Sequence, residues 1–230
     1  MVGQKSKLFA AHAGGVACRA NMRPTQPPII GIAGGIASGK SFVSEHLQRL
    51  GAAVISADQA AHEVLKLEDV KRQARARWGD AIFAADGQID RQALGKIVFA
   101  PPPDGPRERE YLERLTHPRI GEIIGKKLAE LVDPATARAI VLDVPLLFES
   151  GRNKICDTVL FVDAPRSVRE SRALARGWTR EEFASREAVQ QAAETKREQA
   201  DVVIDNSGTP ESARAQVERF WRSLSGSSVP

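Results

Sequence analysis

The eight residues 34–41 read GGIASGKS and constrain the fold more than any other segment, because they match the complete phosphate-loop pattern G-x-x-x-x-G-K-S. Average residue frequencies would place the four fixed positions by chance in roughly one chain in a hundred of this length. The preceding residues 28–33 form an apolar run typical of a buried strand, and Val43, Leu47 and Leu50 then recur at helical spacing. A glycine-rich turn that binds nothing has no need of Lys-Ser at this spacing. The chain is therefore predicted to bind a nucleoside triphosphate.

Each residue type in this loop has a chemical reason. Glycine lets the backbone turn tightly and bring its N–H groups against phosphate oxygens, at a helix N-terminus that favours negative charge. Lys40 is expected to reach the β and γ phosphates, and the Ser41 hydroxyl is expected to ligate Mg²⁺. The predicted nucleotide-binding residues of the loop are Gly34, Gly35, Ile36, Ala37, Ser38, Gly39, Lys40 and Ser41.

Four further apolar runs, at residues 52–57, 139–144, 158–163 and 202–205, read as buried strands. Helical patterns separate them, including a long helix over about 107–131 and a last helix that starts at Thr209-Pro210. Asp90 is expected to cap a short helix, and the proline-rich residues 101–106 are expected to form an exposed loop. Strands that are apolar throughout, separated by helices, predict an α/β fold: a parallel β-sheet of the P-loop NTPase type covered by helices.

Two carboxylates stand at strand ends, and each has a structural and a functional interpretation. Asp143 could merely end its strand, or it could hold Mg²⁺ opposite the phosphate loop. Asp58 could cap the helix beginning at Gln59, or it could take the proton of an acceptor hydroxyl during phosphoryl transfer. Position alone does not decide between these interpretations for Asp58.

Four arginines, at positions 166, 169, 172 and 176, share one helical stripe. A solvated face is the simpler interpretation of such a charge run. In a kinase the same stripe would belong to a lid that closes over the transferring phosphoryl group.

Composition excludes several other classes of protein. Residues 1–27 carry four basic side chains and no acid, which accounts for the whole net charge of +4, so the rest of the chain is neutral. The sequence therefore predicts no nucleic-acid partner, and no apolar stretch suggests a membrane segment. Two cysteines, Cys18 and Cys156, fit a cytoplasmic protein. The basic residues 1–27 are interpreted as a flexible leader, with Met22 as an alternative start.

In its ordered set of motifs the chain resembles the dephospho-CoA kinase family, from about residue 29 to residue 224. The two most specific pieces are VLDVPLLFE at 141–149 and KREQADVVIDNSG at 196–208. The others are GIAGGIASGKS at 31–41, VISAD at 54–58, LTHPRI at 115–120, CDTVLFVDAP at 156–165, and the pair Arg172 and Arg176.

The resemblance implies an ATP-dependent kinase that phosphorylates the ribose 3′-hydroxyl of dephospho-CoA, with ATP and Mg²⁺ as cofactors and a monomer or weak homo-oligomer as the state. It implies a kinase domain over 28–224, containing a helical acceptor-binding insertion at 60–135 and a mobile lid at 166–197, and a tail at 225–230. Asp58 matches the family's base and Arg176 its lid arginine, with Arg172 beside the nucleotide and Asn206 near the adenine. His117, by default a structural histidine, would line the acceptor site with Pro145 and Leu146.

Three departures from the family pattern stand out. Ser56 replaces a second aspartate, so the role of that carboxylate is absent here. Ala37 replaces a common glycine, which is expected to be tolerated if its φ stays negative. The lid is slightly shortened after Arg176. The competing hypotheses are another small-molecule kinase, of the nucleoside or nucleotide type, and a non-enzymatic switch that binds a nucleotide.

Overall fold

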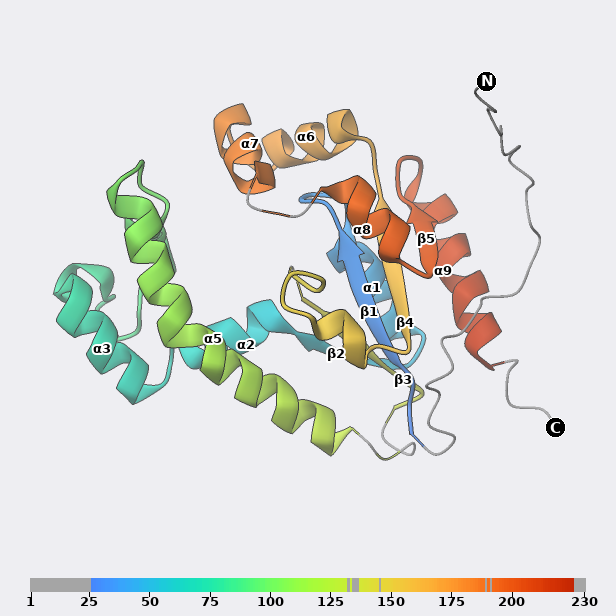
Figure 1. Cartoon of the computed structure of the whole chain (residues 1–230), viewed down its shortest axis with the longest axis horizontal. Coiled ribbons are helices and arrows are strands. Elements are labelled where there is room, and N and C mark those ends of the chain that lie inside the picture. Colours follow the sequence, from blue (N-terminus) through green and yellow to red (C-terminus); the bar gives the residue numbers. More distant parts are fainter. Residues whose placement is uncertain are drawn as a thin grey trace, which may run out of the picture.

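The computed structural model describes residues 26–131, 133, 137–144, 146–188, 190 and 192–225 of the chain. Its centre is a parallel sheet with the strand order β2-β3-β1-β4-β5, which confirms the predicted α/β class (Figure 1). The strands are β1 (Ile29–Gly34), β2 (Ala52–Ser56), β3 (Ala139–Asp143), β4 (Thr158–Asp163) and β5 (Val202–Asp205).

Helices cover both faces of this sheet, as the continuous apolar strands require. On one face, α1 and α9 bury Val43, Leu47, Val217 and Phe220 against the strands. On the other face, α2 and α5 pack an apolar stripe against β2, β3 and β4. The helices are α1 (Lys40–Arg49), α2 (Ala57–Val64), α3 (Glu68–Trp78), α4 (Arg91–Val98), α5 (Asp104–Glu130), α6 (Arg166–Ala175), α7 (Arg180–Ala188), α8 (Ala193–Gln199) and α9 (Pro210–Ser225), with the 3₁₀ turns η1 (Asp80–Ile82) and η2 (Arg152–Ile155).

Gly31 in the central strand β1 shows how closely the segment between β3 and β4 packs on the sheet. A Cβ atom at Gly31 would lie 2.8 Å from both Cys156 Sγ and Leu147 Cδ2. Only a residue without a side chain lets the segment after β3 approach β1 this closely. That segment carries several of the predicted acceptor residues, so its position matters for the site.

The register of the strands brings the chemistry-bearing residues to one edge. Asp143 pairs with Ile32 of β1 on one side and with Ser56 of β2 on the other. All carboxyl ends of a parallel sheet lie at the same edge, so the phosphate loop after β1 adjoins the ends of β2 and β3. At this edge α6 and α7 stand at the top of Figure 1.

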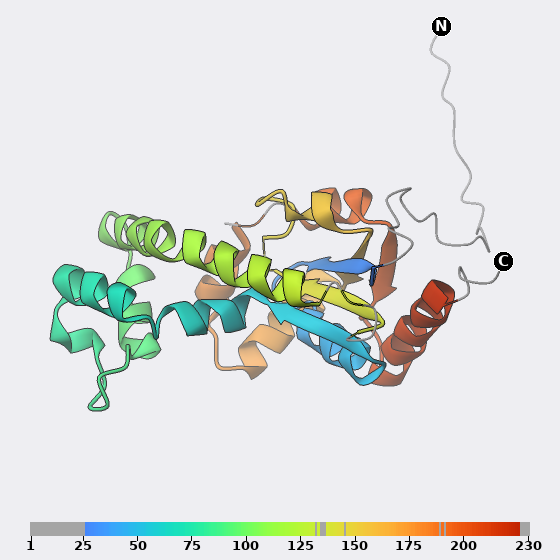
Figure 2. The ribbon, with the colours of Figure 1, turned by 90° about the horizontal axis from the view of Figure 1, so that it is seen from below.

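Helices α3 and α4 and the first half of α5 project away from the sheet and have a small core of their own (Figure 2). Asp90 caps α4 as predicted, accepting from Gln92 N at 2.8 Å and Ala93 N at 3.2 Å. The predicted loop over 101–106 is wrong in its second half, because α5 already begins at Asp104. Pro106 is tolerated there, since the first turn of a helix has no partners for its N–H groups.

Within the described residues no helix is long and apolar enough to cross a membrane. The predicted leader at 1–27 and tail at 225–230 lie outside the described residues except for Gln26, Pro27 and Ser225.

Glu108 joins α3 to α5 through three hydrogen bonds. Its carboxylate accepts from Arg77 Nε at 2.8 Å, Arg77 Nη2 at 2.6 Å and Trp78 Nε1 at 2.9 Å. The bonds from Arg77, and then that from Trp78, lower the pKa of Glu108 from 4.5 to about 2. A carboxyl group with a depressed folded-state pKa stabilises the fold above its unfolded pKa, and this contribution is lost as the pH falls through the folded value.

We therefore expect Glu108→Gln to lower the melting temperature most above pH 4.5, with a difference from the wild type that shrinks as the pH falls toward 2. Thermal unfolding followed by circular dichroism at a series of pH values measures it. Glu122→Gln, an exposed position on the same helix, is the control and should show no such trend. A Glu108→Gln deficit that stays constant with pH would contradict this account.

Candidate active site

The phosphate loop turns sharply between β1 and α1, and two glycines make the turn possible. Gly34 has φ +155°, and a Cβ there would lie 2.6 Å from Ser38 Oγ and 2.7 Å from the Val162 carbonyl. Gly39 caps α1 with φ +101°, and a Cβ there would overlap the Asn206 amide. Both positions therefore need glycine for conformation and for space.

Side chains that lie more than 130 residues later in the sequence donate hydrogen bonds to the carbonyl oxygens of the loop. Ser38 O accepts from Asn206 Nδ2 at 2.7 Å and from Arg172 Nη1 at 3.1 Å. Ile36 O accepts from Arg169 Nη1 at 3.4 Å. In a trans peptide the N–H points opposite to the C=O, so the N–H groups of Ala37 and Gly39 face away from these side chains. A phosphate cradle needs amides presented in this way.

Ala37 departs from expectation. Its φ is +58°, whereas tolerance of alanine at this position was expected on the condition that φ stays negative. The left-handed region brings Cβ close to the following carbonyl oxygen and costs roughly 1–2 kcal/mol per residue. The loop therefore holds Ala37 in a strained conformation that a glycine would adopt freely.

Lys40 lies beside two carboxylates. Its Nζ donates to Gly34 O at 3.1 Å and to Gly35 O at 3.4 Å. Burial lowers the pKa of Lys40, while the nearby charges of Asp143 and Asp58 oppose that shift. Burial likewise raises the pKa of Asp143, opposed by Lys40. The charges of Lys40, Asp143 and Asp58 therefore interact electrostatically.

Asp58 is not the helix cap that one interpretation assigned to it. Helix α2 begins at Ala57, and Ser56 is its N-cap, with Oγ accepting from Gln59 N at 3.3 Å. Ser56 therefore serves as the cap of this helix. Asp58 is left with its side chain on a cavity.

That cavity, of about 380 Å³, brings Asp58 together with His117 and Leu146 as predicted. It also contains Ser150 and Arg152, which the sequence did not indicate because each stands outside any recognisable pattern. We call it the Asp58 cavity. Its other lining residues are Ala57, Ala61, Ile120 and Val144. Pro145, a predicted acceptor residue, lies outside the described residues.

A second cavity, of about 220 Å³, lies on the other side of the loop and unites Arg172, Arg176 and Asn206 with Gly39. We call it the Asn206 cavity. Phe42, Gly208 and Pro210 complete its lining. Phe42 was missed because an apolar residue in the first turn of a helix is usually interpreted as packing, although here it lines the Asn206 cavity.

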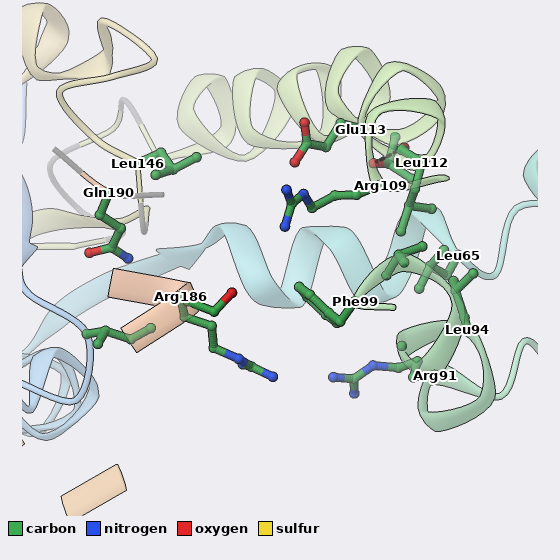
Figure 3. A pocket seen from close by; sticks show the side chains of 15 residues that line it. Leu65, Arg91, Leu94, Phe99, Arg109, Leu112, Glu113, Leu146, Arg186 and Gln190 are labelled. Carbon is green, nitrogen blue, oxygen red and sulfur yellow. Dashed lines mark hydrogen bonds between the residues drawn. The ribbon is translucent and has the colours of Figure 1, made fainter. Parts of the chain in front are cut away.

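The largest of these spaces is a groove of about 530 Å³ between α4 and α5 of the predicted acceptor-binding insertion and α7 of the predicted lid (Figure 3). Arg91, Arg109 and Arg186 point their guanidinium groups into it, and none of the three forms an ion pair with another described residue. Leu146 lines both the groove and the Asp58 cavity, so the two adjoin. The apolar wall is formed by Ile36, Leu65, Leu94, Val98, Phe99 and Leu112.

The arginine stripe is only partly solvated. Arg169 and Arg172 both turn inward onto the loop, and Arg169 is only 6% exposed. Arg166 pairs with Glu187 at 2.9 Å, while Arg176 is exposed at the Asn206 cavity. Helical spacing placed the four together but could not show which neighbours they would meet.

A buried ion pair was also missed. Lys196 is 2% exposed and binds Glu149 Oε1 at 2.8 Å, and its charge lowers the pKa of Lys40. The pair joins α8 to the segment after β3, and it therefore helps to hold α8 against that segment. In the sequence these two residues are 47 positions apart, and no spacing rule connects them.

The predicted metal ligands offer two oxygens. Ser41 is exposed in the first turn of α1, and Asp143 ends β3. Within the described part of the chain no group of three or more His, Cys, Asp or Glu side chains could hold a metal ion. A divalent cation here would need most of its ligands from water and from a nucleotide.

Comparison with known proteins gives one consistent result. The family model for dephospho-CoA kinase matches residues 28–211. The chain is 43% identical over 195 residues to the dephospho-CoA kinase of Geobacter sulfurreducens, covering 84% of this chain and 96% of the relative. It is 44% identical over 193 residues to that of Carboxydothermus hydrogenoformans, covering 83% and 91%.

Solved structures agree. The crystal structure of TT1252 from Thermus thermophilus superposes with a TM-score of 0.69 at 32% identity, covering 89% of this chain and all of that chain. Dephospho-CoA kinase from Campylobacter jejuni shares the fold, with a TM-score of 0.61 at 24% identity and coverage of 86% and 97%.

The strain at Ala37 can be measured. We expect Ala37→Gly to raise the free energy of unfolding by up to about 1 kcal/mol, since relief of the left-handed penalty exceeds the entropy that glycine adds to the unfolded chain. Chemical denaturation gives this value. The control is Ala76→Gly on the exposed face of α3, which should lose about 1 kcal/mol. Equal losses in both variants would contradict the assignment.

Proposed function

The chain belongs to the dephospho-CoA kinase family, and from this premise we propose that it transfers the γ-phosphoryl group of ATP to the ribose 3′-hydroxyl of dephospho-CoA. The products are CoA and ADP, and the reaction is the final step of CoA biosynthesis. The observation that supports this most directly is that one edge of the sheet carries Lys40 on the phosphate loop, Asp143 at the end of β3 and Asp58 after β2, and that Asp58 also lines a separate cavity.

We assign the nucleotide to the loop and the Asn206 cavity. Amides of the loop and Lys40 hold the β and γ phosphates, and Arg172 and Arg176 neutralise the charge that spreads over the transferring group. Phe42 and Pro210 provide apolar surface for the adenine beside Asn206. Positioning and charge neutralisation supply most of the catalysis in such a transfer.

We assign the acceptor to the Asp58 cavity and the groove. The 3′-hydroxyl lies at Asp58, whose carboxylate takes the proton as the O3′–P bond forms and the bond from phosphorus to the ADP oxygen breaks. His117 and Leu146 surround the nucleoside part, and Pro145, which lies outside the described residues, stays a predicted acceptor residue. The basic and apolar walls of the groove fit the diphosphate and the extended arm of dephospho-CoA respectively.

Mg²⁺ fits the donor set. Ser41 and Asp143 offer two oxygens, and Mg²⁺ characteristically binds through one or two protein oxygens while keeping water and phosphate ligands. A bound Mg²⁺ would supply positive charge that offsets the negative charge of the ATP phosphates. In this assignment Asp143 and Ser41 hold the ion, and Lys40 remains on the phosphate oxygens.

The proposed division of the chain follows the site. Residues 28–224 form the kinase domain, in which 60–135 are the acceptor-binding insertion and 166–197 are the lid, whose helices α6 and α7 stand over the loop (Figure 1). The substrates and the small number of cysteines suit a cytoplasmic enzyme. We propose that it acts as a monomer or weak homo-oligomer.

An acceptor screen tests this function. With Mg·ATP and coupled detection of ADP, we expect saturable turnover with dephospho-CoA and a product phosphorylated at the 3′ position, identified by mass spectrometry and NMR. Turnover with a nucleoside or nucleotide instead would identify a different small-molecule kinase. ATP hydrolysis that no acceptor alters would support a nucleotide-dependent switch.

Replacement of the proposed base gives a sharper test. Asp58→Asn should keep the fold and ATP binding but lower kcat by about two to four orders of magnitude, the usual contribution of a general base. Steady-state kinetics with both substrates saturating measures this. Asp86→Asn, in an exposed turn outside the cavities, is the matched control and should retain kcat. An unchanged kcat in Asp58→Asn would remove Asp58 from catalysis.

A further inference from the structure

Arg169 lies where three parts of the molecule meet. Its Nε donates to the Ala164 carbonyl after β4 at 3.1 Å, and its Nη1 donates to the Ile36 carbonyl of the phosphate loop at 3.4 Å. The same Nη1 lies 2.7 Å from Glu187 Oε1 on α7. The guanidinium also packs on Gly35, where a Cβ atom would come within 3.0 Å of Nη1.

The ion pair with Glu187 is needed to keep Arg169 where it is. A buried guanidinium without a counter-charge is strongly unfavourable, and the side chain of Arg169 is only 8% exposed. The other carboxylate oxygen of Glu187, Oε2, accepts a hydrogen bond from Arg166 Nε at 2.9 Å. The inward position of Arg169, and with it the bond to the Ile36 carbonyl, therefore depends on α7 resting in its present place.

The residue before Glu187 faces the other substrate. The Arg186 guanidinium lies 4.1 Å from the centroid of the Trp178 ring and 5.0 Å from that of Phe99, and it lines the groove (Figure 3). Phe99, in turn, belongs to the segment that follows α4. Arg186 and Glu187 are consecutive residues of α7. Arg186 lines the groove, and Glu187 binds Arg169, which in turn binds the phosphate loop.

We propose that Glu187 and Arg169 are positioning residues that couple the acceptor groove to the phosphate loop, so that acceptor and nucleotide bind cooperatively. An anionic acceptor held by Arg186 fixes α7, α7 holds Glu187 on Arg169, and Arg169 holds the Ile36 carbonyl so that the Ala37 amide faces the phosphates. Neither residue touches the reacting atoms. The inference rests on the proposed function, because it takes the groove as the acceptor site.

Isothermal titration with the non-hydrolysable analogue AMP-PNP, with and without saturating dephospho-CoA, tests the coupling. For the wild type we expect the acceptor to tighten AMP-PNP binding by about fivefold or more, the lower end of usual coupling strengths. Glu187→Gln should reduce this factor to less than about twofold. The Kd for AMP-PNP should rise more with dephospho-CoA present than without it, because the bonds from Arg172 and Asn206 to the Ser38 carbonyl do not depend on Glu187. Glu187→Asp, which keeps the charge on a shorter side chain, should restore part of the factor.

The matched control is Glu170→Gln. Glu170 also joins α6 to α7, through Arg180 at 3.4 Å, and it pairs with Arg166 of its own helix at 3.3 Å, but it does not bind Arg169. It should therefore keep the wild-type coupling, as well as a similar melting temperature. A merely structural role for Glu187 would weaken AMP-PNP binding equally with and without acceptor.

The inference is overturned if the wild type shows no coupling, if Glu187→Gln keeps the full factor, or if it weakens both affinities equally. Its failure is distinguishable from failure of the proposed function. A wild-type protein that phosphorylates dephospho-CoA but shows one of these results loses only the coupling, whereas a protein that does not phosphorylate dephospho-CoA loses the assignment of the groove.

Discussion

The site depends on how the peptide groups of the phosphate loop are oriented. Amides can face a polyphosphate only if the carbonyl oxygens of the same peptides are bound elsewhere, and a buried carbonyl without a donor is unfavourable. Arg169, Arg172 and Asn206 supply those donors from segments that follow β4 and β5. Asn206 stands 168 residues after Ser38, so the loop has its shape only when the sheet is complete. Nucleotide binding and folding of the whole domain are therefore linked.

The same dependence explains why the chemistry gathers at one edge. Parallel pairing sets Ser56 beside Asp143, and Asp143 beside Ile32, two residues before Gly34. Asp58 follows in the first turn of α2. Burial lowers the pKa of Lys40 and raises the pKa of Asp143, so it favours the neutral form of each group. The same burial strengthens every charge interaction with a bound phosphate. A closed, charged edge of this kind has little use without an anionic ligand.

Much of the fold and part of the site could be predicted from local sequence patterns. The five strands, the Asp90 cap, the start of α9 and the grouping of Asp58 with His117 and Leu146 follow from apolar periodicity, capping chemistry and motif resemblance. Local rules failed where distant segments decide. The φ of Ala37 is imposed by the loop, and the inward turn of Arg169 depends on Glu187 in a different helix. The groove lies between helices whose spacing no motif encodes. Ser56 as the cap of α2 was within reach, since serine is a preferred N-cap residue.

Leu146, which borders both the Asp58 cavity and the groove, has a consequence for molecular shape. A molecule that fills both spaces has to pass over a branched aliphatic side chain, which requires rotatable bonds at that point. Short or rigid nucleosides can occupy one compartment and leave the other to solvent. In the proposed function, this single leucine would favour long, flexible acceptors over shorter or rigid compounds that carry the same sugar and base.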